Sequence, residues 1–115
     1  MTIKNLQQWD IVKVRVRPED PAEHPAILLS PQEIIDADNV ARVTVIYGTT
    51  KRPTQTIRQG QILLNGADGL EHLTIFDVSQ IYTLPKTIIR EKMGTIGAER
   101  RRLLKRIIIT TYRLV

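Results

Sequence analysis

The fold is decided by the stretch Val40-Ala41-Arg42-Val43-Thr44-Val45-Ile46-Tyr47. It is rich in Val, Ile and Thr, whose branched side chains favour extended backbone, so it predicts the strongest strand of the chain. Upstream, residues 10–17 alternate with period two: Val12, Val14 and Val16 fall on one side, and the other side holds Ile11, Lys13, Arg15 and Arg17. That alternation predicts a half-buried strand.

Four more segments have the length and composition of strands. They are residues 26–29, 61–64, 70–76 and 78–84. Pro85 interrupts the last of these segments. Between the second and the third, Asn65-Gly66-Ala67-Asp68-Gly69 carries turn chemistry. Short strands at this spacing predict a small barrel or sandwich rather than a parallel sheet with crossover helices. The expected fold class is therefore mainly β (α+β), in a single domain over residues 1–115.

Two segments predict helices. Ser30-Pro31-Gln32-Glu33 has the pattern of a capping box, with Ser30 as the N-cap, and indicates a short helix. From Ala98 onward an apolar stripe predicts a C-terminal helix, and its members are Leu103, Leu104, Ile107, Ile108, Leu114 and Val115. Residues 107–111 are all β-branched and are poor helix formers, so this helix is expected to have a weak or strand-like end.

Two polar segments predict connections. Residues 17–25 contain three prolines and three acidic residues, which is typical of an exposed loop. Residues 48–55 contain no core-forming side chain, so we expect a loop or an irregular strand there.

The composition excludes several classes of protein. Hydrophobic residues make up 42% and charged residues 25% of the chain, which is a globular composition. No apolar run approaches the roughly 18–20 residues of a membrane span, and the N-terminus lacks the apolar region of a secretory signal, so we expect a cytoplasmic protein with no membrane partner. The absence of cysteine excludes disulfides, zinc ribbons and thiol catalysis.

Basic residues gather toward the C-terminus. The chain has 17 Lys and Arg against 12 Asp and Glu, a formal net charge of +5. From Lys86 to the end there are nine basic residues and two acidic ones, Glu91 and Glu99. This surplus favours an acidic partner such as nucleic acid, an anionic membrane or an acidic polypeptide. A solvated basic surface explains it equally well.

Several segments, in order, resemble the PemK/MazF family of plasmid-maintenance and growth-inhibitor toxins. Trp9-Asp10-Ile11-Val12 stands where the family has Gly-Asp-Ile-Val, and residues 24–31 (His-Pro-Ala-Ile-Leu-Leu-Ser-Pro) stand where it has Arg-Pro-Ala, an apolar strand and Ser-Pro. The later matches are Thr49-Thr50, Ile62-Leu63-Leu64, Gly69-Leu70, Gln80-Ile81-Tyr82-Thr83-Leu84 and Met93-Gly94-Thr95-Ile96. The resemblance covers roughly residues 7–108.

Such a resemblance implies an SH3-like barrel of the PemK/MazF/CcdB type and a homodimer. It also implies a metal-independent endoribonuclease that is the toxin of a type II toxin–antitoxin system. The partners that it implies are RNA and an antitoxin with an acidic, disordered tail that covers the RNA groove.

The chain departs from the family at charged positions. His24 stands where the family typically has the Arg before Pro. In the family's Asp-Gln-(Ile/Val)-Arg stretch, Ser79 holds the Asp position and Tyr82 the Arg position, and Ile88 replaces a later Arg. Residues of the fold are kept while charged residues of the site are replaced, which weakens the transfer of catalytic roles.

The residues that remain define a candidate site. Cleavage of RNA without metal needs a base for the 2′-hydroxyl proton, an acid for the 5′-oxygen and donors for the developing phosphorane charge. A histidine can act as acid or base near neutral pH, and threonine hydroxyls can hydrogen-bond phosphate oxygens. We therefore predict His24 and Thr49 as catalytic residues and no metal ligands. The predicted phosphate-binding residues are Thr50, Lys51, Arg52 and Arg15.

Alternatives stay open for these residues. His24 is equally explained as an exposed loop residue, and Thr49-Thr50 as the end of a strand. Trp9 and Tyr82 can stack on bases, although Trp9 also fits as a cap of the core. Arg100-Arg101-Arg102 fits a solvated helix face or a contact with phosphate or antitoxin. The whole protein can also be a catalytically silent relative, or a CcdB-like poison of a topoisomerase.

Overall fold

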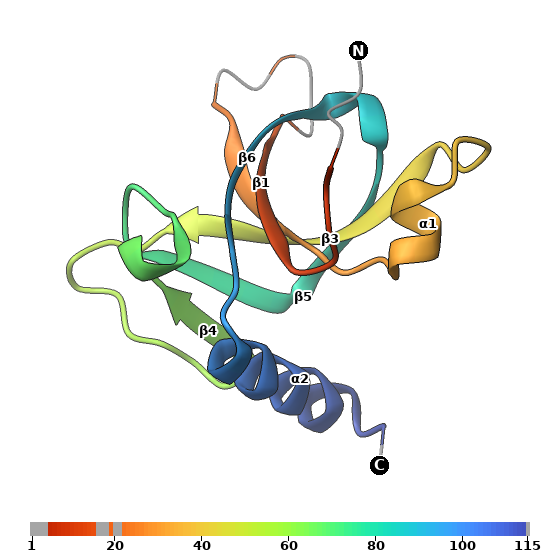
Figure 1. Ribbon diagram of the computed structural model, residues 1–115. Coiled ribbons are helices and arrows are strands. Elements are labelled where there is room, and N and C mark those ends of the chain that lie inside the picture. The colour runs from red at the N-terminus through yellow and green to blue at the C-terminus, as the bar shows by residue number, and fades with distance from the viewer. Residues whose placement is uncertain (1–4, 16–18, 20–21, 115) are drawn as a thin grey trace.

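The computed structural model describes residues 5–15, 19 and 22–114 (Figure 1). Within them the chain forms strands β1 to β6, helices α1 and α2, and two 3-10 turns, η1 and η2. Their bounds, in chain order, are β1 Asp10–Val14, β2 His24–Leu28, α1 Gln32–Asp36, β3 Arg42–Thr50, β4 Gln61–Leu64, η1 Gly66–Asp68, β5 Thr74–Pro85, η2 Lys86–Ile88, β6 Ile89–Thr95 and α2 Ala98–Tyr112.

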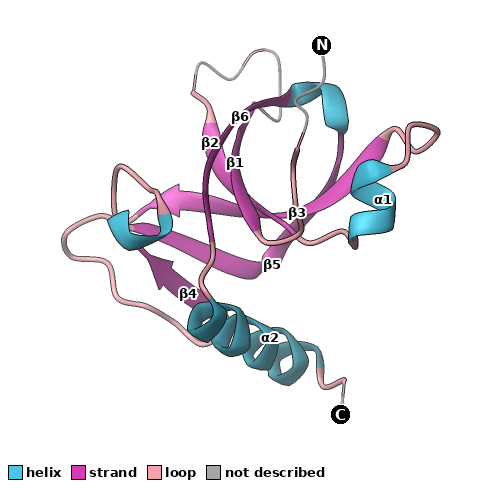
Figure 2. Ribbon diagram, viewed as in Figure 1, coloured by secondary structure: helices cyan, strands magenta, loops and turns pink. Residues whose placement is uncertain are grey.

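The six strands form one antiparallel sheet in the order β4-β5-β3-β2-β1-β6. The sheet is strongly curled, and α2 lies alongside β4 and β5 while α1 lies beside the start of β3 (Figure 2). This architecture confirms the mainly β class with a short helix and a C-terminal helix. Among the described residues no ladder joins the edge strands β4 and β6, so closure of the sheet into a barrel stays a prediction.

Two glycines bring the far edges of the sheet into contact. A Cβ atom on Gly94 of β6 would lie 2.1 Å from the carbonyl oxygen of Asp68, and one on Gly69 would lie 2.4 Å from that of Met93. Gly69 also has a φ of 95°, in the left-handed region that favours glycine. The η1 turn that follows β4 can therefore approach β6 only because both positions lack a side chain.

Both faces of the sheet are covered. One core includes Leu104 of α2, and its members are Ile11, Ile27, Ile46, Ile62, Leu64, Leu70, Phe76, Val78, Ile96 and Leu104. The second core packs against Ile34 and Ile35 of α1, and its members are Leu6, Val12, Val14, Ala26, Leu28, Val43, Val45, Leu84 and Ile89. Because Ile11 and Val12 are both fully buried, β1 is buried on both faces, and the prediction of a half-buried strand was wrong.

Several strand boundaries differ from the prediction. The expected strands over residues 70–76 and 78–84 are one strand, β5, which starts only at Thr74 and runs through Pro85. Gly48–Thr50 belong to β3 and pair with residues 74–76 of β5 after a register shift, which agrees with the irregular strand that was one of the two alternatives for residues 48–55. Strand β6 was not predicted, and its centre, Arg90-Glu91-Lys92, is charged and exposed at the sheet edge. Residues 16–18, 20 and 21 of the predicted strand and loop lie outside the described residues.

The capping box was also wrong. The N-cap of α1 is Pro31, and no side chain caps this helix. The hydroxyl of Ser30 instead accepts a hydrogen bond of 2.8 Å from the backbone N–H of Thr44. Ser30 is buried, so its oxygen joins the connection before α1 to β3.

The C-terminal helix continues to Tyr112 and has no strand-like end. Ile107 and Ile108 pack against the first core, and this contact outweighs the low helix propensity of the β-branched run. The apolar stripe was partly misplaced, because Leu103 is 46% exposed and Leu114 is 66% exposed. Val115 lies outside the described residues.

Trp9 and Asp10 begin β1 with two unusual features. Trp9 has a φ of 76°, which a non-glycine residue rarely adopts. Its ring packs against the first core, as the sequence indicated, with the Lys105 ammonium 5.6 Å from the ring centroid. The carboxylate of Asp10 is fully buried and accepts hydrogen bonds from the Gln7 N–H and the Thr95 hydroxyl, 2.8 and 2.7 Å long. These contacts join the start of β1 to the end of β6.

Candidate functional site

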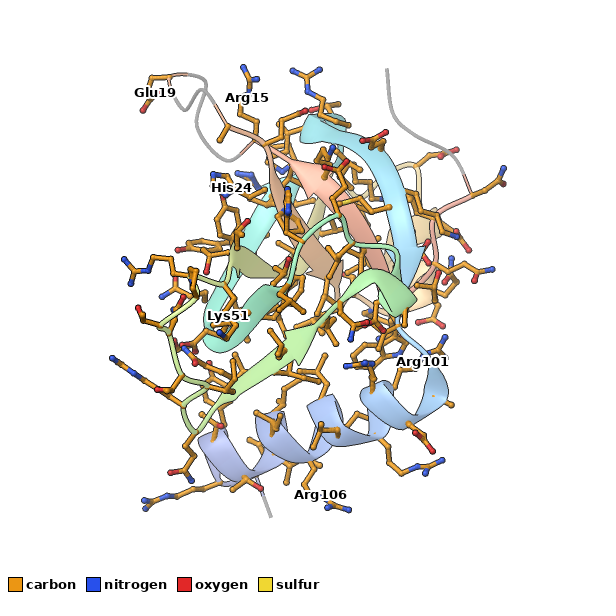
Figure 3. The ribbon with its side chains drawn as sticks, turned by 90° about the vertical axis from the view of Figure 1, so that its left-hand side faces the viewer. Arg15, Glu19, His24, Lys51, Arg101 and Arg106 are labelled. Atoms are coloured by element: carbon orange, nitrogen blue, oxygen red, sulfur yellow. The ribbon has the colours of Figure 1, made fainter. Side chains whose placement is uncertain are left out.

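Arg15, His24, Thr49 and Thr50 come from one end of the sheet. His24 is the first residue of β2 and pairs with Val14, the last residue of β1, so Arg15 follows directly beside it. Figure 3 looks onto this side of the molecule and shows Arg15 and His24 near each other, with Lys51 below them. The structure therefore brings the predicted residues of three strands to one end of the sheet.

The register between β2 and β3 relates His24 to Thr49. The last pair of that ladder is Ala26 with Tyr47. In an antiparallel pair, the residues two positions beyond it are His24 on β2 and Thr49 on β3, so both lie at the same end. Thr49 and Thr50 are exposed, and they pair with Ile75 and Thr74 of β5 on the other side.

Lys51 and Arg52 continue from the end of β3. The N–H of Lys51 donates to the carbonyl of Leu73 over 2.8 Å, and its ammonium donates to the carbonyl of Arg52 over 3.2 Å. The N–H of Arg52 donates to the side chain of Gln55, and the Arg52 side chain is exposed. These bonds shape the start of the connection to β4 and keep two cationic side chains beside the end of β3.

Arg15 carries an unusual donor. Its side chain is half-buried, and its Nε atom is buried with no hydrogen-bond partner among the described residues. A buried donor without an acceptor costs free energy of the order of 1–3 kcal/mol. An anionic oxygen reaching this position would satisfy the donor, and guanidinium groups suit phosphate oxygens in particular.

Three aromatic rings that the sequence did not predict as a group lie in a row beside these residues. His24, Tyr47 and Tyr82 come from the neighbouring strands β2, β3 and β5. The ring centroids of His24 and Tyr47 are 4.9 Å apart, and those of Tyr47 and Tyr82 are 5.6 Å apart with the planes at 78°. We call these three residues the aromatic row. Tyr47 ends the strongest predicted strand, but only the register of β3 with β5 places it beside Tyr82.

A bulge in β5 sets the position of Tyr82. Ile46 pairs with Ile81 but Gly48 pairs with Phe76, so five positions of β5 span two of β3. Asp77 holds the bulge: its carboxylate accepts from the N–H and hydroxyl of Ser79, at 2.9 and 2.6 Å, and from Gln61 at 3.1 Å. Burial raises the pKa of Asp77, but these hydrogen bonds and the charge of Arg58 outweigh it, so that the pKa lies below its ordinary value.

Ser79 and Ile88, which stand where the resemblance implies charged residues, make contacts within the fold. The hydroxyl of Ser79 is bonded to Asp77, and Ile88 packs against the second core. In the basic run of α2, Arg100 contacts Asp68 at 3.3 Å and the carbonyl of Leu63 at 3.0 Å, and Arg101 donates to the carbonyl of Ile96. Arg100 therefore joins α2 to β4 and η1, whereas Arg101 bonds to the connection just before α2.

Three further observations concern cavities, metal sites and membrane spans among the described residues. A cavity of about 480 Å³ opens between α1, the start of β3 and η2, and Lys86, Asp36 and Ile35 are among its lining residues. It shares no residue with the aromatic row. Among residues 5–15, 19 and 22–114, no three His, Asp or Glu side chains cluster so that they could hold a metal ion. Neither helix in this part of the chain is both long and apolar enough to cross a membrane.

A family model described as "PemK-like, MazF-like toxin of type II toxin-antitoxin system" matches residues 7–111. The chain belongs to this family. The match covers all six strands and all but the last residue of α2, so the whole fold described above is that of a PemK-like, MazF-like toxin. No curated protein matches the sequence.

Solved structures share this fold at low sequence identity. The chain is similar to an endoribonuclease in complex with its cognate antitoxin from a mycobacterial species, with a TM-score of 0.75, 16% identity, and coverage of 96% of this chain and 98% of that one. It is also similar to the Mycobacterium tuberculosis toxin MazF-mt6, with a TM-score of 0.74, 16% identity, and coverage of 90% and 96%. A further mycobacterial endoribonuclease has a TM-score of 0.71, 16% identity, and coverage of 91% and 88%.

Proposed function

We propose that this chain is the toxin of a type II toxin–antitoxin system and that it cleaves single-stranded RNA without a metal ion. The observation that carries the proposal is the common position of His24, Thr49 and Arg15 at one end of the sheet, in a member of a toxin family. The family match and the fold shared with mycobacterial endoribonucleases support it.

The chemistry follows from the side chains at this end. The imidazole of His24 takes the proton of a 2′-hydroxyl, and the 2′-oxygen attacks the adjacent phosphorus. The bond from phosphorus to the 5′-oxygen breaks, the leaving oxygen takes up a proton from a solvent water, and the His24 imidazolium returns its proton to solvent. The products are a 2′,3′-cyclic phosphate on one fragment and a 5′-hydroxyl on the other, so atoms and charge balance without a cofactor.

Hydrogen-bond donors around His24 stabilise the charge that develops on the phosphorane. The Thr49 hydroxyl donates to a non-bridging oxygen, and Thr50 hydrogen-bonds the neighbouring phosphate. The guanidinium of Arg15 satisfies its buried Nε on a phosphate oxygen, while Lys51 and Arg52 offset the remaining charge. This set replaces the arginine that the family usually has before the proline of β2.

The proposal includes the partners and setting that the family implies. An acidic antitoxin binds the basic surface, which accounts for the surplus of Lys and Arg. Two copies form a homodimer that covers exposed strand edges. We further propose that residues 1–115 form one SH3-like barrel domain that acts in the cytoplasm.

The direct test incubates the purified protein with long RNA in EDTA. Cleavage by the wild type and its loss in His24→Ala would support the nuclease. Intact RNA at excess protein would refute it. Growth inhibition with intact RNA would then point to another target, such as a topoisomerase.

A catalytically silent relative is the second candidate. The observation that favours it is the loss of charge at His24 and Tyr82, where the family pattern has arginine. A silent relative would bind RNA or antitoxin without cutting, and the same assay together with a binding measurement separates it from the nuclease.

A further inference from the structure

Tyr82 presents an aromatic face beside the end of the sheet that carries His24. Tyr82 is 39% exposed although it lies within β5, between two other strands. Its hydroxyl donates to the side chain of Gln80 over 2.7 Å, which fixes the direction of the ring along the strand. Of the two tyrosines in the aromatic row, Tyr47 packs against the second core and Tyr82 does not. The exposed face of Tyr82 is therefore open to contact with a binding partner.

The aromatic row connects the exposed Tyr82 to His24, the proposed catalytic residue. Tyr47 stands between Tyr82 and His24 and is half-buried against the second core. The interplanar angle falls from 78° between the two tyrosines to 39° between Tyr47 and His24. Tyr47 therefore separates a planar group that lies on Tyr82 from the imidazole of His24.

We propose that Tyr82, supported by Tyr47, is a stacking platform for an unpaired base of the RNA substrate. This inference rests on the proposed function and names a recognition element of the same site. Base stacking on aromatic side chains is sequence-tolerant and uses the π-face that every base has. The charge lost at position 82 is thereby replaced by an apolar contact to the base.

Nucleic acid fits this surface better than an apolar protein partner. The aromatic row is flanked by cationic groups, because Arg15 follows the strand next to His24 and Lys51 follows the end of β3. Arg15 also has the buried Nε that lacks an acceptor. Aromatic faces beside phosphate-binding cations are the combination that single-strand binding proteins use.

The test measures binding by fluorescence anisotropy with two labelled oligonucleotides. The first is a ten-nucleotide 2′-fluoro uridine strand, which lacks the nucleophile and cannot be cut. The second has the same backbone with its central nucleotides abasic. Tyr82→Ala is expected to weaken binding of the first by about 5- to 150-fold and to leave binding of the second unchanged. Tyr82→Phe keeps the ring and is expected to bind both as the wild type does.

Ile81→Ala is the matched control. Ile81 is the neighbour of Tyr82 on the same strand, is 36% exposed and points to the other face of the sheet. It is expected to bind both oligonucleotides as the wild type does. Melting temperatures of all variants show whether a loss of binding reflects unfolding.

Several results would overturn the inference. If the wild type and Tyr82→Ala bound the uridine strand equally well, the proposal of a stacking platform would be refuted. The proposal of RNA cleavage would not be affected by this result. An equal loss on both oligonucleotides would mean that Tyr82 acts without contacting a base. Poly-glutamate serves as a probe for an acidic protein partner. If Tyr82→Ala bound poly-glutamate more weakly than the wild type but bound RNA equally well, the aromatic row would be assigned to such a partner. A wild type that neither binds nor cuts RNA would refute the proposed function together with the platform.

Discussion

The imidazole of His24 lies 4.9 Å from the ring of Tyr47, centroid to centroid, with the planes tilted by 39°. The two residues come from neighbouring strands, and the backbone of His24 is paired with Val14 on its other side. The position of the imidazole is therefore set by the pairing of His24 with β1 and by its ring contact with Tyr47 of β3. A residue held in this way can take part in chemistry that needs a fixed position.

His24→Ala is expected to lower the rate of RNA cleavage by roughly 10²–10⁴-fold, because it removes the group that transfers the proton. His24→Arg is expected to be as slow, since arginine stays charged at every working pH and cannot act as a base. Single-turnover cleavage from pH 5 to 9 measures both variants. A His24→Arg protein as fast as the wild type would show that position 24 supplies only charge.

Arg15→Ala is expected to weaken RNA binding and to reduce the slope of log affinity against log salt by about one, because one phosphate contact is lost. The matched control is Arg106→Ala. Arg106 is exposed on α2, far from Arg15 and His24 in Figure 3. Anisotropy titrations between about 50 and 200 mM salt give both slopes. An unchanged slope in Arg15→Ala would exclude a phosphate at its Nε.

Gly94→Ala is expected to destabilise the fold by about 1–3 kcal/mol, because the new Cβ atom would overlap the carbonyl of Asp68. Gly66→Ala is the control, since a Cβ there meets no atom within 4 Å. Urea unfolding monitored through Trp9 measures both. Equal urea midpoints for Gly94→Ala and Gly66→Ala would mean that the stability of the fold does not depend on the close approach of η1 and β6.

Asp77→Asn is expected to reduce the decrease in the free energy of unfolding that occurs at acidic pH. The pKa of Asp77 is lowered from an ordinary value of 3.8, so its carboxylate stabilises the folded state above that pH. This contribution is lost as pH falls through the lowered pKa of the folded state. The free energy of unfolding, compared between pH 7 and pH 3, should therefore fall less in the variant. Parallel losses in both proteins would contradict this role.

The sequence predicted the fold class because the signals were local. The β-branched run over residues 40–47 contains the first six residues of β3, and the segment with apolar spacing after Ala98 forms α2. Strand β6 was missed because its stability comes from pairing with β1, while its own residues at positions 90–92 are charged. Ser30 was misassigned because its hydroxyl is used by Thr44, a contact that local sequence does not contain.

The site was predictable only in part. The resemblance selected His24 and Thr49, but their common position depends on the register of β2 with β3, which is a property of the assembled sheet. Tyr47 gave no functional signal in the sequence. Its place beside Tyr82 depends on the β5 bulge, which in turn rests on hydrogen bonds from Ser79 and Gln61 to Asp77.

End-group analysis of RNA treated in EDTA tests the central claim most directly. The wild type is expected to produce discrete fragments with 2′,3′-cyclic phosphate and 5′-hydroxyl ends, and His24→Ala is expected to produce none under the same conditions. RNA left intact by excess wild-type protein, or fragments formed equally by His24→Ala, would contradict the account.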